Sequence, residues 1–248
     1  MRTFTMGRRR QRRRAGLVAG LVGVVGVVGL AASAGASVAA VRGSTSAELA
    51  QLKTKLLVKS DFPKGWSTQG KVATSSGQGS NSFPGMSQLA GCLGISQSIL
   101  ELNEPSVTSP NFVSSSQTQN VQENLGIFPS AKVGNEEEES LGNAKVPTCM
   151  DSLLNGPEKS QLQSSFGKGY TVGTVNVAAI SPSILIPHSS GFVMSFPVTN
   201  QGQTITTSVA LIDAFRGKDG VQLMVTSVGS ALSSATQKHA LTVAYNRM

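Results

Sequence analysis

Residues 170 to 228 read YTVGTVNVAAI, SPSILIPHSS, GFVMSFPVTN, QGQ, TITTSVALIDAF, RGKDG and VQLMVTSV, and this stretch decides the fold. Four of its segments are rich in β-branched residues and alternate between apolar and polar side chains, which is the pattern of β-strands. They cover residues 170–180, 191–199, 204–215 and 221–228. The connections at 200–203 and 216–220 are short and contain glycine, which adopts the positive φ of hairpin turns. The sequence therefore predicts an antiparallel meander.

Helical periodicity flanks this meander on both sides. Residues 47–58 place leucines on one stripe, and Pro63 and Gly65 follow as stop signals. Further helices are predicted over residues 86–102, 129–143, 146–155 and 230–248, and a strand region over 112–128. In the last helix we expect the sheet to be covered by Leu232, Ala235, His239, Leu241 and Ala244. The predicted fold class is α+β, with one antiparallel sheet covered by helices on one face.

The chain begins with an arginine-rich segment and a long apolar run. Seven of the 21 basic residues precede position 15, and residues 15–41 carry no charge. A positive block before an apolar run is typical of a leader that directs export across the cytoplasmic membrane. We expect residues 1–42 to be a signal peptide, or a signal anchor that stays in the membrane, since about 20 apolar residues suffice to span it. Cleavage sites are predicted after Ala34, Ala36 or Ala40, and twin-arginine export is a further alternative.

The leader also explains the net charge of +8. Beyond position 40 the chain holds 14 basic against 13 acidic side chains, and the first acidic residue is Glu48. Such a balance lacks the positive excess that neutralises phosphates. Nucleic acid is therefore not expected among the partners.

The two cysteines, Cys92 and Cys149, both lie in the part expected to be exported. In an oxidising compartment an isolated pair favours a disulfide. The alternatives are a metal pair and a reactive thiol, but the two histidines, His188 and His239, do not lie at ligand spacing from either cysteine. We predict a Cys92–Cys149 disulfide.

The other residues that could act in catalysis or ligand binding are predicted to have structural roles. Recognised nucleophile-elbow, phosphate-loop, zinc-protease and CxxC motifs do not occur in the sequence. Glu136 to Glu139 predict a solvated helix face, because adjacent carboxylates on a helix point in different directions. His188 is expected in a solvated loop and His239 on the flank of the last helix. Trp66 is expected in the core and loop 181–190 as a cap on the sheet. We expect the chain to have no enzymatic activity and to bind no cofactor and no metal.

Several motifs resemble those of a known family. The LLVKSDFPKGW segment at 56–66 is similar to the start of many exported actinobacterial proteins. NLGIFPSAKVG at 124–134, VPTC at 146–149 and VQLMVTSVG at 221–229 resemble the extracellular sensor domain of PknH-type mycobacterial serine/threonine kinases. The chain departs from that pattern at Val146, where such domains often carry a tryptophan, and in having one cysteine pair. The resemblance implies an antiparallel sheet with helices and a cleft for an extracellular ligand, with no kinase domain ahead of the leader.

Together these observations predict one exported domain over residues 43–248, with a flexible Ser/Gly-rich loop at 67–84. We expect a non-enzymatic, sensor-like domain that binds an unknown ligand at the cell surface or in the medium. The alternative is a structural envelope protein that makes protein contacts. If the leader stays uncleaved, its apolar run also attaches the chain to the membrane.

The predicted bridge has a measurable consequence for stability. It closes a loop of about 58 residues, for which chain entropy gives roughly 4 kcal/mol of stabilisation. We expect Cys149→Ser to lower the free energy of unfolding by an amount of this order in urea titrations under non-reducing conditions. An unchanged unfolding curve would refute the structural role of the bridge.

Overall fold

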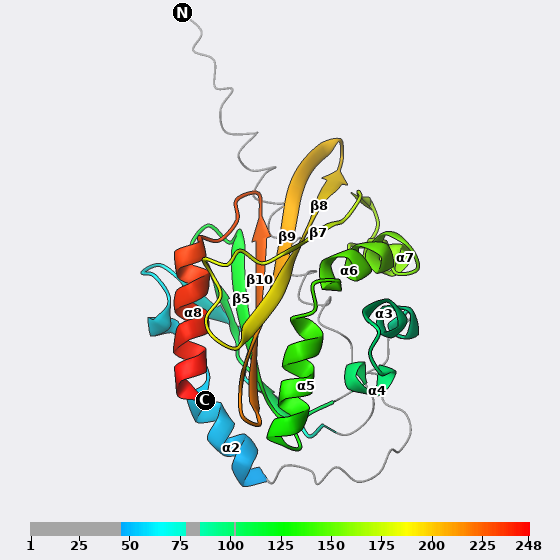
Figure 1. Ribbon diagram of the computed structural model, residues 1–248. Helices are drawn as coiled ribbons and strands as arrows, with labels where there is room; N and C mark the ends of the chain where they lie inside the picture. Colours follow the sequence, from blue (N-terminus) through cyan, green and yellow to red (C-terminus); the bar gives the residue numbers. More distant parts are fainter. Residues whose placement is uncertain (1–45, 78–84, 102) are drawn as a thin grey trace, which may run out of the picture.

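The computed structural model describes residues 46–77, 85–101 and 103–248 (Figure 1). The leader expected over residues 1–42 lies outside these ranges. The helices are α2 (Ser46–Lys55), α3 (Met86–Leu93), α4 (Gln97–Leu100), α5 (Ala131–Leu141), α6 (Val146–Asn155), α7 (Lys159–Ser165) and α8 (Ser234–Arg247), with a short 3-10 helix, η1 (Lys59–Asp61). The strands are β1 (Ser67–Gln69), β2 (Ala73–Ser75), β3 (Ser106–Thr108), β4 (Asn111–Val113), β5 (Gln119–Ile127), β6 (Tyr170–Val172), β7 (Asn176–Ala179), β8 (Ser189–Asn200), β9 (Gln203–Arg216) and β10 (Asp219–Val228).

All strands belong to one antiparallel sheet of ten strands, which confirms the α+β class. Its main path runs β1-β4-β5-β10-β9-β8-β6, while β2 and β3 extend it beside β5 and β7 lies beside β8. The predicted meander is present as β8, β9 and β10, joined by hairpins. Its first predicted strand is split into β6 and β7 around Gly173, whose N–H donates to Pro197 O at 2.8 Å.

Helices cover both faces of the sheet, whereas the sequence predicted cover on one face. On β10 the side chains of Leu223 and Val225 belong to the core beneath α2 and α8. Their neighbour Met224 belongs to a second core with α3, α6 and α7. Figure 1 shows α2 and α8 on one side of the sheet and α3, α5, α6 and α7 on the other. Alternate residues of a strand point to opposite faces of the sheet. Long strands that are apolar at both odd and even positions therefore need helices on both faces.

Several segments differ from the sequence prediction. Residues 67–69 and 73–75, predicted within a polar loop, form the exposed strands β1 and β2, because backbone pairing with β4 and β3 outweighs their polar side chains. Helix α7 was not predicted. Helix α8 buries Gln237, Ala240, Leu241 and Ala244, a spacing of three and four residues. The expectation for Ala235 and His239 is therefore wrong, because both are exposed on this helix.

Trp66 and the apolar residues of loop 181–190 lie where the sequence predicted them. Trp66 is 7% exposed and stacks on Phe62 at 5.0 Å between ring centroids, and Phe62 stacks on Phe112 at 4.4 Å. In the loop between β7 and β8, Ile184 is buried in the core beneath α8. Within the described ranges, we find no helix that combines the length and apolar character needed to cross a membrane.

Candidate functional site

A row of polar side chains crosses the sheet on the face that α5 covers. Cross-strand pairing aligns Ser190, Asp213, Gln222, Asn124 and Thr108 across β8, β9, β10, β5 and β3. Gln222 Nε2 donates to Asp213 Oδ1 at 2.9 Å, and Thr108 Oγ1 donates to Asn124 Oδ1 at 3.0 Å. A polar row on a covered sheet face is unusual, because buried polar groups lower stability unless they find partners.

Two further carboxyl groups lie over this row. Glu137 of α5 has a buried Oε2 without a hydrogen-bond partner among the described residues. Glu104 lies across Gly126, where a Cβ atom would come within 2.6 Å of Glu104 Cγ. The negative charges of Glu104 and Asp213 both raise the pKa of Glu137. The three carboxyl groups thus form a cluster between α5 and the sheet, which we call the α5 seat (Glu104, Glu137 and Asp213).

Burial controls the protonation of the α5 seat. Desolvation, reinforced by the negative charges of Glu104 and Asp213, raises the pKa of Glu137 to about 8. Burial likewise raises the pKa of Asp213 to about 7, against a smaller lowering by the hydrogen bond from Gln222. The pKa of Glu104 is also raised by burial. The α5 seat therefore takes up and releases protons near neutral pH.

The backbone of α5 approaches the sheet closely at one end. The helix begins after Ser130, whose Oγ accepts a hydrogen bond from Val133 N at 3.3 Å. A Cβ atom on Gly134 would lie 2.7 Å from Gly217 O in the β9–β10 turn. Glycine at position 134 thus permits the contact that fixes the first turns of α5 beside the sheet.

The run Glu136 to Glu139 departs from the solvated face predicted for it. Glu137 faces the sheet, and Glu138 Oε1 lies 3.2 Å from His188 Nδ1. Glu136 makes an exposed ion pair with Lys132 at 3.7 Å, and Glu139 is exposed. The prediction of a solvated side chain holds for Glu136 and Glu139 and is wrong for Glu137. No local signal marks the difference, because the helix phase relative to the sheet is set by tertiary contacts.

The two histidines lie on different elements. His188 is exposed in the β7–β8 loop, as predicted, and adopts a φ of 58°. His239 is exposed on α8, where its charge acts on Asp61. Among the described residues, no group of three or more His, Cys, Asp or Glu side chains is arranged to hold a metal ion.

A second charged cluster lies on the opposite face and secures the chain ends. Arg247 of α8 donates to both carboxylate oxygens of Asp61, at 2.7 and 2.9 Å, and to Leu56 O at 2.9 Å. Glu123 of β5 is fully buried, and its Oε2 accepts a hydrogen bond from Leu57 N at 2.6 Å. We call Asp61, Glu123 and Arg247 the terminal clamp. It gives a physical reason for the LLVKSD part of the N-terminal motif.

The two carboxyl groups of the terminal clamp have opposite shifts. Burial raises the pKa of Glu123 to about 7. Burial also acts to raise the pKa of Asp61, but the hydrogen bonds from Arg247 and Val58 N outweigh it, so the pKa of Asp61 is lowered. Asp61 is therefore the charged anchor of this clamp. Sequence reasoning missed the cluster, because its members are far apart along the chain.

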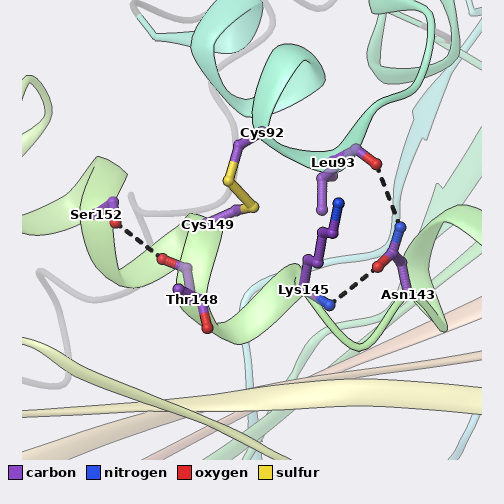
Figure 2. The surroundings of a disulfide bond; sticks show 7 residues. All are labelled: Cys92, Leu93, Asn143, Lys145, Thr148, Cys149 and Ser152. Carbon is purple, nitrogen blue, oxygen red and sulfur yellow. Dashed lines mark hydrogen bonds between the residues drawn. A yellow bond between two sulfur atoms is a disulfide. The ribbon is translucent and has the colours of Figure 1, made fainter.

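The predicted disulfide is present and joins α3 to α6 (Figure 2). The Cα atoms of Cys92 and Cys149 are 5.8 Å apart. A hollow of about 90 Å³ adjoins the bridge, and it is lined by Gln88, Leu89, Cys92, Cys149, Ser152 and Leu153. This volume is well below the several hundred Å³ of typical small-molecule pockets.

Comparisons with solved structures returned several matches, among them two proteins of Mycobacterium tuberculosis. The extracellular domain of PknH from Mycobacterium tuberculosis matches with a TM-score of 0.41 and 9% sequence identity, over 84% of this chain and 98% of that chain. LpqN, involved in cell envelope biogenesis of Mycobacterium tuberculosis, matches with a TM-score of 0.22 and 14% identity, over 74% and 75% of the two chains. No protein-family model and no curated protein sequence matches.

The α5 seat makes stability depend on pH. Groups whose pKa is raised by folding favour the folded state at low pH, and this advantage is lost as the pH rises through the folded pKa. We therefore expect the free energy of unfolding to fall between about pH 5 and about pH 8. Glu137→Gln should flatten this fall and raise stability at the alkaline end by about 1 to 3 kcal/mol in urea titrations. The matched control, Glu139→Gln on the exposed side of α5, should keep the wild-type slope, and equal slopes in all three proteins would refute the assignment.

Within the terminal clamp, the Asp61–Arg247 pair predicts a dependence of opposite sign. A carboxylate with a lowered pKa stabilises the fold above its unfolded pKa, and this stability is lost as the pH falls. We expect Arg247→Met to lower the free energy of unfolding at neutral pH by about 1 to 3 kcal/mol and to weaken this loss at acid pH. The control Arg216→Met changes an exposed arginine and should leave thermal and urea unfolding unaltered. If both variants behave alike, the clamp does not contribute to stability.

Proposed function

We propose that this chain is an exported, sensor-like domain that binds a ligand outside the cytoplasmic membrane and has no enzymatic activity. The observation that carries the proposal is the Cys92–Cys149 disulfide. Disulfides persist in oxidising compartments and are rare in the cytosol. The arginine-rich and apolar pattern of residues 1–42 supports the same location.

The sensor-like role is supported by the way α5 is held. The side of α5 that faces the sheet meets carboxyl groups as well as Phe128, and Glu137 Oε2 has no hydrogen-bond partner among the described residues. A helix seated on groups that titrate near neutral pH changes its attachment when their charge changes. We propose α5 as the element that responds to conditions or to a ligand outside the cell.

The non-enzymatic part of the proposal is supported by what the candidate catalytic groups contact. His188 Nδ1 lies 3.2 Å from the carboxylate of Glu138, so its partner is a carboxylate and not a nucleophile. His239 is exposed on α8, on a different element. Turnover of an ester or peptide substrate that disappears in His188→Ala or His239→Ala would overturn this part of the proposal.

The alternative, a structural envelope protein, would need a surface for protein contacts. Both faces of the central sheet are covered by the protein's own helices. The large apolar side chains exposed within the described ranges are Val58 and Val72, at 48% and 43%. These observations favour the sensor-like domain over a contact protein that uses the sheet face.

Export and ligand binding are tested together by non-reducing intact-mass measurement on protein recovered separately from the membrane and the medium. We expect a species lighter by two hydrogens than its reduced form, with either the full leader in the membrane or a shortened chain in the medium. Reproducible additional mass that disappears on denaturation identifies a bound ligand. Cys149→Ser provides the control, because it cannot form the bridge. Reduced protein confined to the cytoplasm would overturn the location, and oxidised exported protein without added mass under any growth condition would count against ligand binding.

A further inference from the structure

The two sulfur atoms of the disulfide have different environments. Cys92, near the end of α3, is exposed, whereas Cys149 in α6 is 3% exposed and belongs to the apolar core. Figure 2 shows the bridge running from the α3 helix to α6. Thiol–disulfide exchange requires a thiolate to reach one of the two sulfur atoms, so access selects Cys92 for attack and Cys149 as the leaving group.

The hollow beside the bridge gives an incoming thiol room. Gln88 and Leu89 of α3 and Ser152 and Leu153 of α6 line it together with the two cysteines. Its volume of about 90 Å³ is small for a metabolite but sufficient for the end of a cysteine side chain. The hollow therefore fits a reactive sulfur better than it fits a conventional ligand.

The helix position of Cys149 offsets part of the cost that its apolar surroundings impose on a thiolate. It lies in the first turn of α6, which begins at Val146 and has Lys145 at its N-cap without a side-chain cap. Lys145 and Cys149 are four residues apart and share one side of the chain at this helix end. A positive side chain and the positive end of a helix dipole both stabilise a thiolate.

The bridge is also a principal attachment of α3. Two glycines in the left-handed region flank the helix, Gly85 with a φ of 82° and Gly94 with a φ of 73°. Leu89 and Leu93 pack in the core shared with α6, and Asn143 Nδ2 donates to Leu93 O at 3.3 Å. Helix α3 thus lies on α6 and is joined to it covalently by the bridge, so opening the bridge removes the covalent part of this attachment.

We propose that the Cys92–Cys149 disulfide is a thiol–disulfide exchange site, opened at Cys92 by an external dithiol, and that its opening releases α3 from α6. The attacking thiolate forms a bond with Cys92 Sγ while the bridge breaks, and the electron pair leaves on Cys149 Sγ, which takes a proton from water. The second thiol then loses its proton and displaces Cys92 from the mixed disulfide. The dithiol becomes a disulfide and the bridge becomes two thiols, so two electrons pass from the dithiol to the protein.

The site of attack is tested with the oxidised, folded protein and glutathione, a monothiol that leaves the first adduct in place. Free thiols are then blocked with N-ethylmaleimide, and the peptides are analysed by mass spectrometry. We expect glutathione on Cys92 and maleimide on Cys149, with at least about a tenfold excess over the reverse pattern. Adducts mainly on Cys149, or reaction only in denaturant, would overturn the proposal.

The role of the hollow is tested by filling it. Ser152 is exposed and its hydroxyl donates to Thr148 O at 3.0 Å within α6. Ser152→Phe should slow exchange at least about fivefold by blocking the approach of the thiol. The matched control is Ser164→Phe on α7, an exposed serine whose hydroxyl also donates to a backbone carbonyl of its own helix. Equal slowing by both variants, or by neither, would refute access through the hollow.

The release of α3 is tested by hydrogen exchange before and after reduction with dithiothreitol, a dithiol. We expect the largest loss of protection in residues 86–93 and in the first turns of α6, well beyond the loss in β9 and β10 that follows from the lower free energy of unfolding. Unchanged exchange in α3 would overturn the release, and an equal loss of protection in α3 and in the sheet would show that the bridge supports the whole fold instead of one helix. Purified protein suffices for these measurements, so their outcome is independent of any ligand or of export.

Discussion

The pairing of β9 with β10 places alternate side chains on two opposite faces of one sheet, and both faces must be removed from water. The residues Ile212, Leu223 and Val225 belong to one core, and Val209, Met224 and Val228 belong to the other. Because each core is incomplete without helices, the two strands require cover on both sides. The arrangement of α2 and α8 against α3, α5, α6 and α7 follows from this requirement (Figure 1).

The two covered faces treat charge differently. Beneath α8, the terminal clamp pairs Asp61 with Arg247 through two short hydrogen bonds, and it connects the start of the described chain to its end. Beneath α5, the described structure places Glu104, Glu137 and Asp213 together, and protonation near neutral pH takes the place of a positive partner. Charge therefore strengthens the Asp61–Arg247 contact as the pH rises from acid values. It weakens the α5 seat as the pH rises past neutrality, and the buried Glu123 on the α8 side responds in the same way as the α5 seat.

The disulfide adds a constraint that the sheet does not supply. Helix α3 lies on α6, one layer away from the strands, and Leu89 and Leu93 extend the second core there. A covalent bond to Cys149 adds to this packing, and the exposure of Cys92 leaves the same bond open to exchange. Stability of α3 and chemical accessibility of the bridge thus arise from one position at the edge of the second core.

Local sequence patterns were sufficient for the meander, for helices such as α6, and for the Cys92–Cys149 pair. Alternation, helical spacing and turn glycines act between neighbouring residues, so they can be read without knowledge of the fold. The packing of helices on both faces of the sheet could not be predicted from the sequence, because a short apolar run does not indicate how many helices pack against it. The phase of α8 was likewise predicted in part, with Leu241 and Ala244 on the buried side and His239 wrongly assigned to it.

The sequence by itself determined the strand order of the meander, most of the helical segments and the cysteine pairing, because each follows from local spacing or from the small number of cysteines. Only the tertiary structure decided that Glu137 Oε2 is buried while Glu139 is exposed, and that Glu123 receives a hydrogen bond from Leu57. The protonation of a carboxyl group depends on its distance from water and from other charges, and both distances are set by segments remote in the chain.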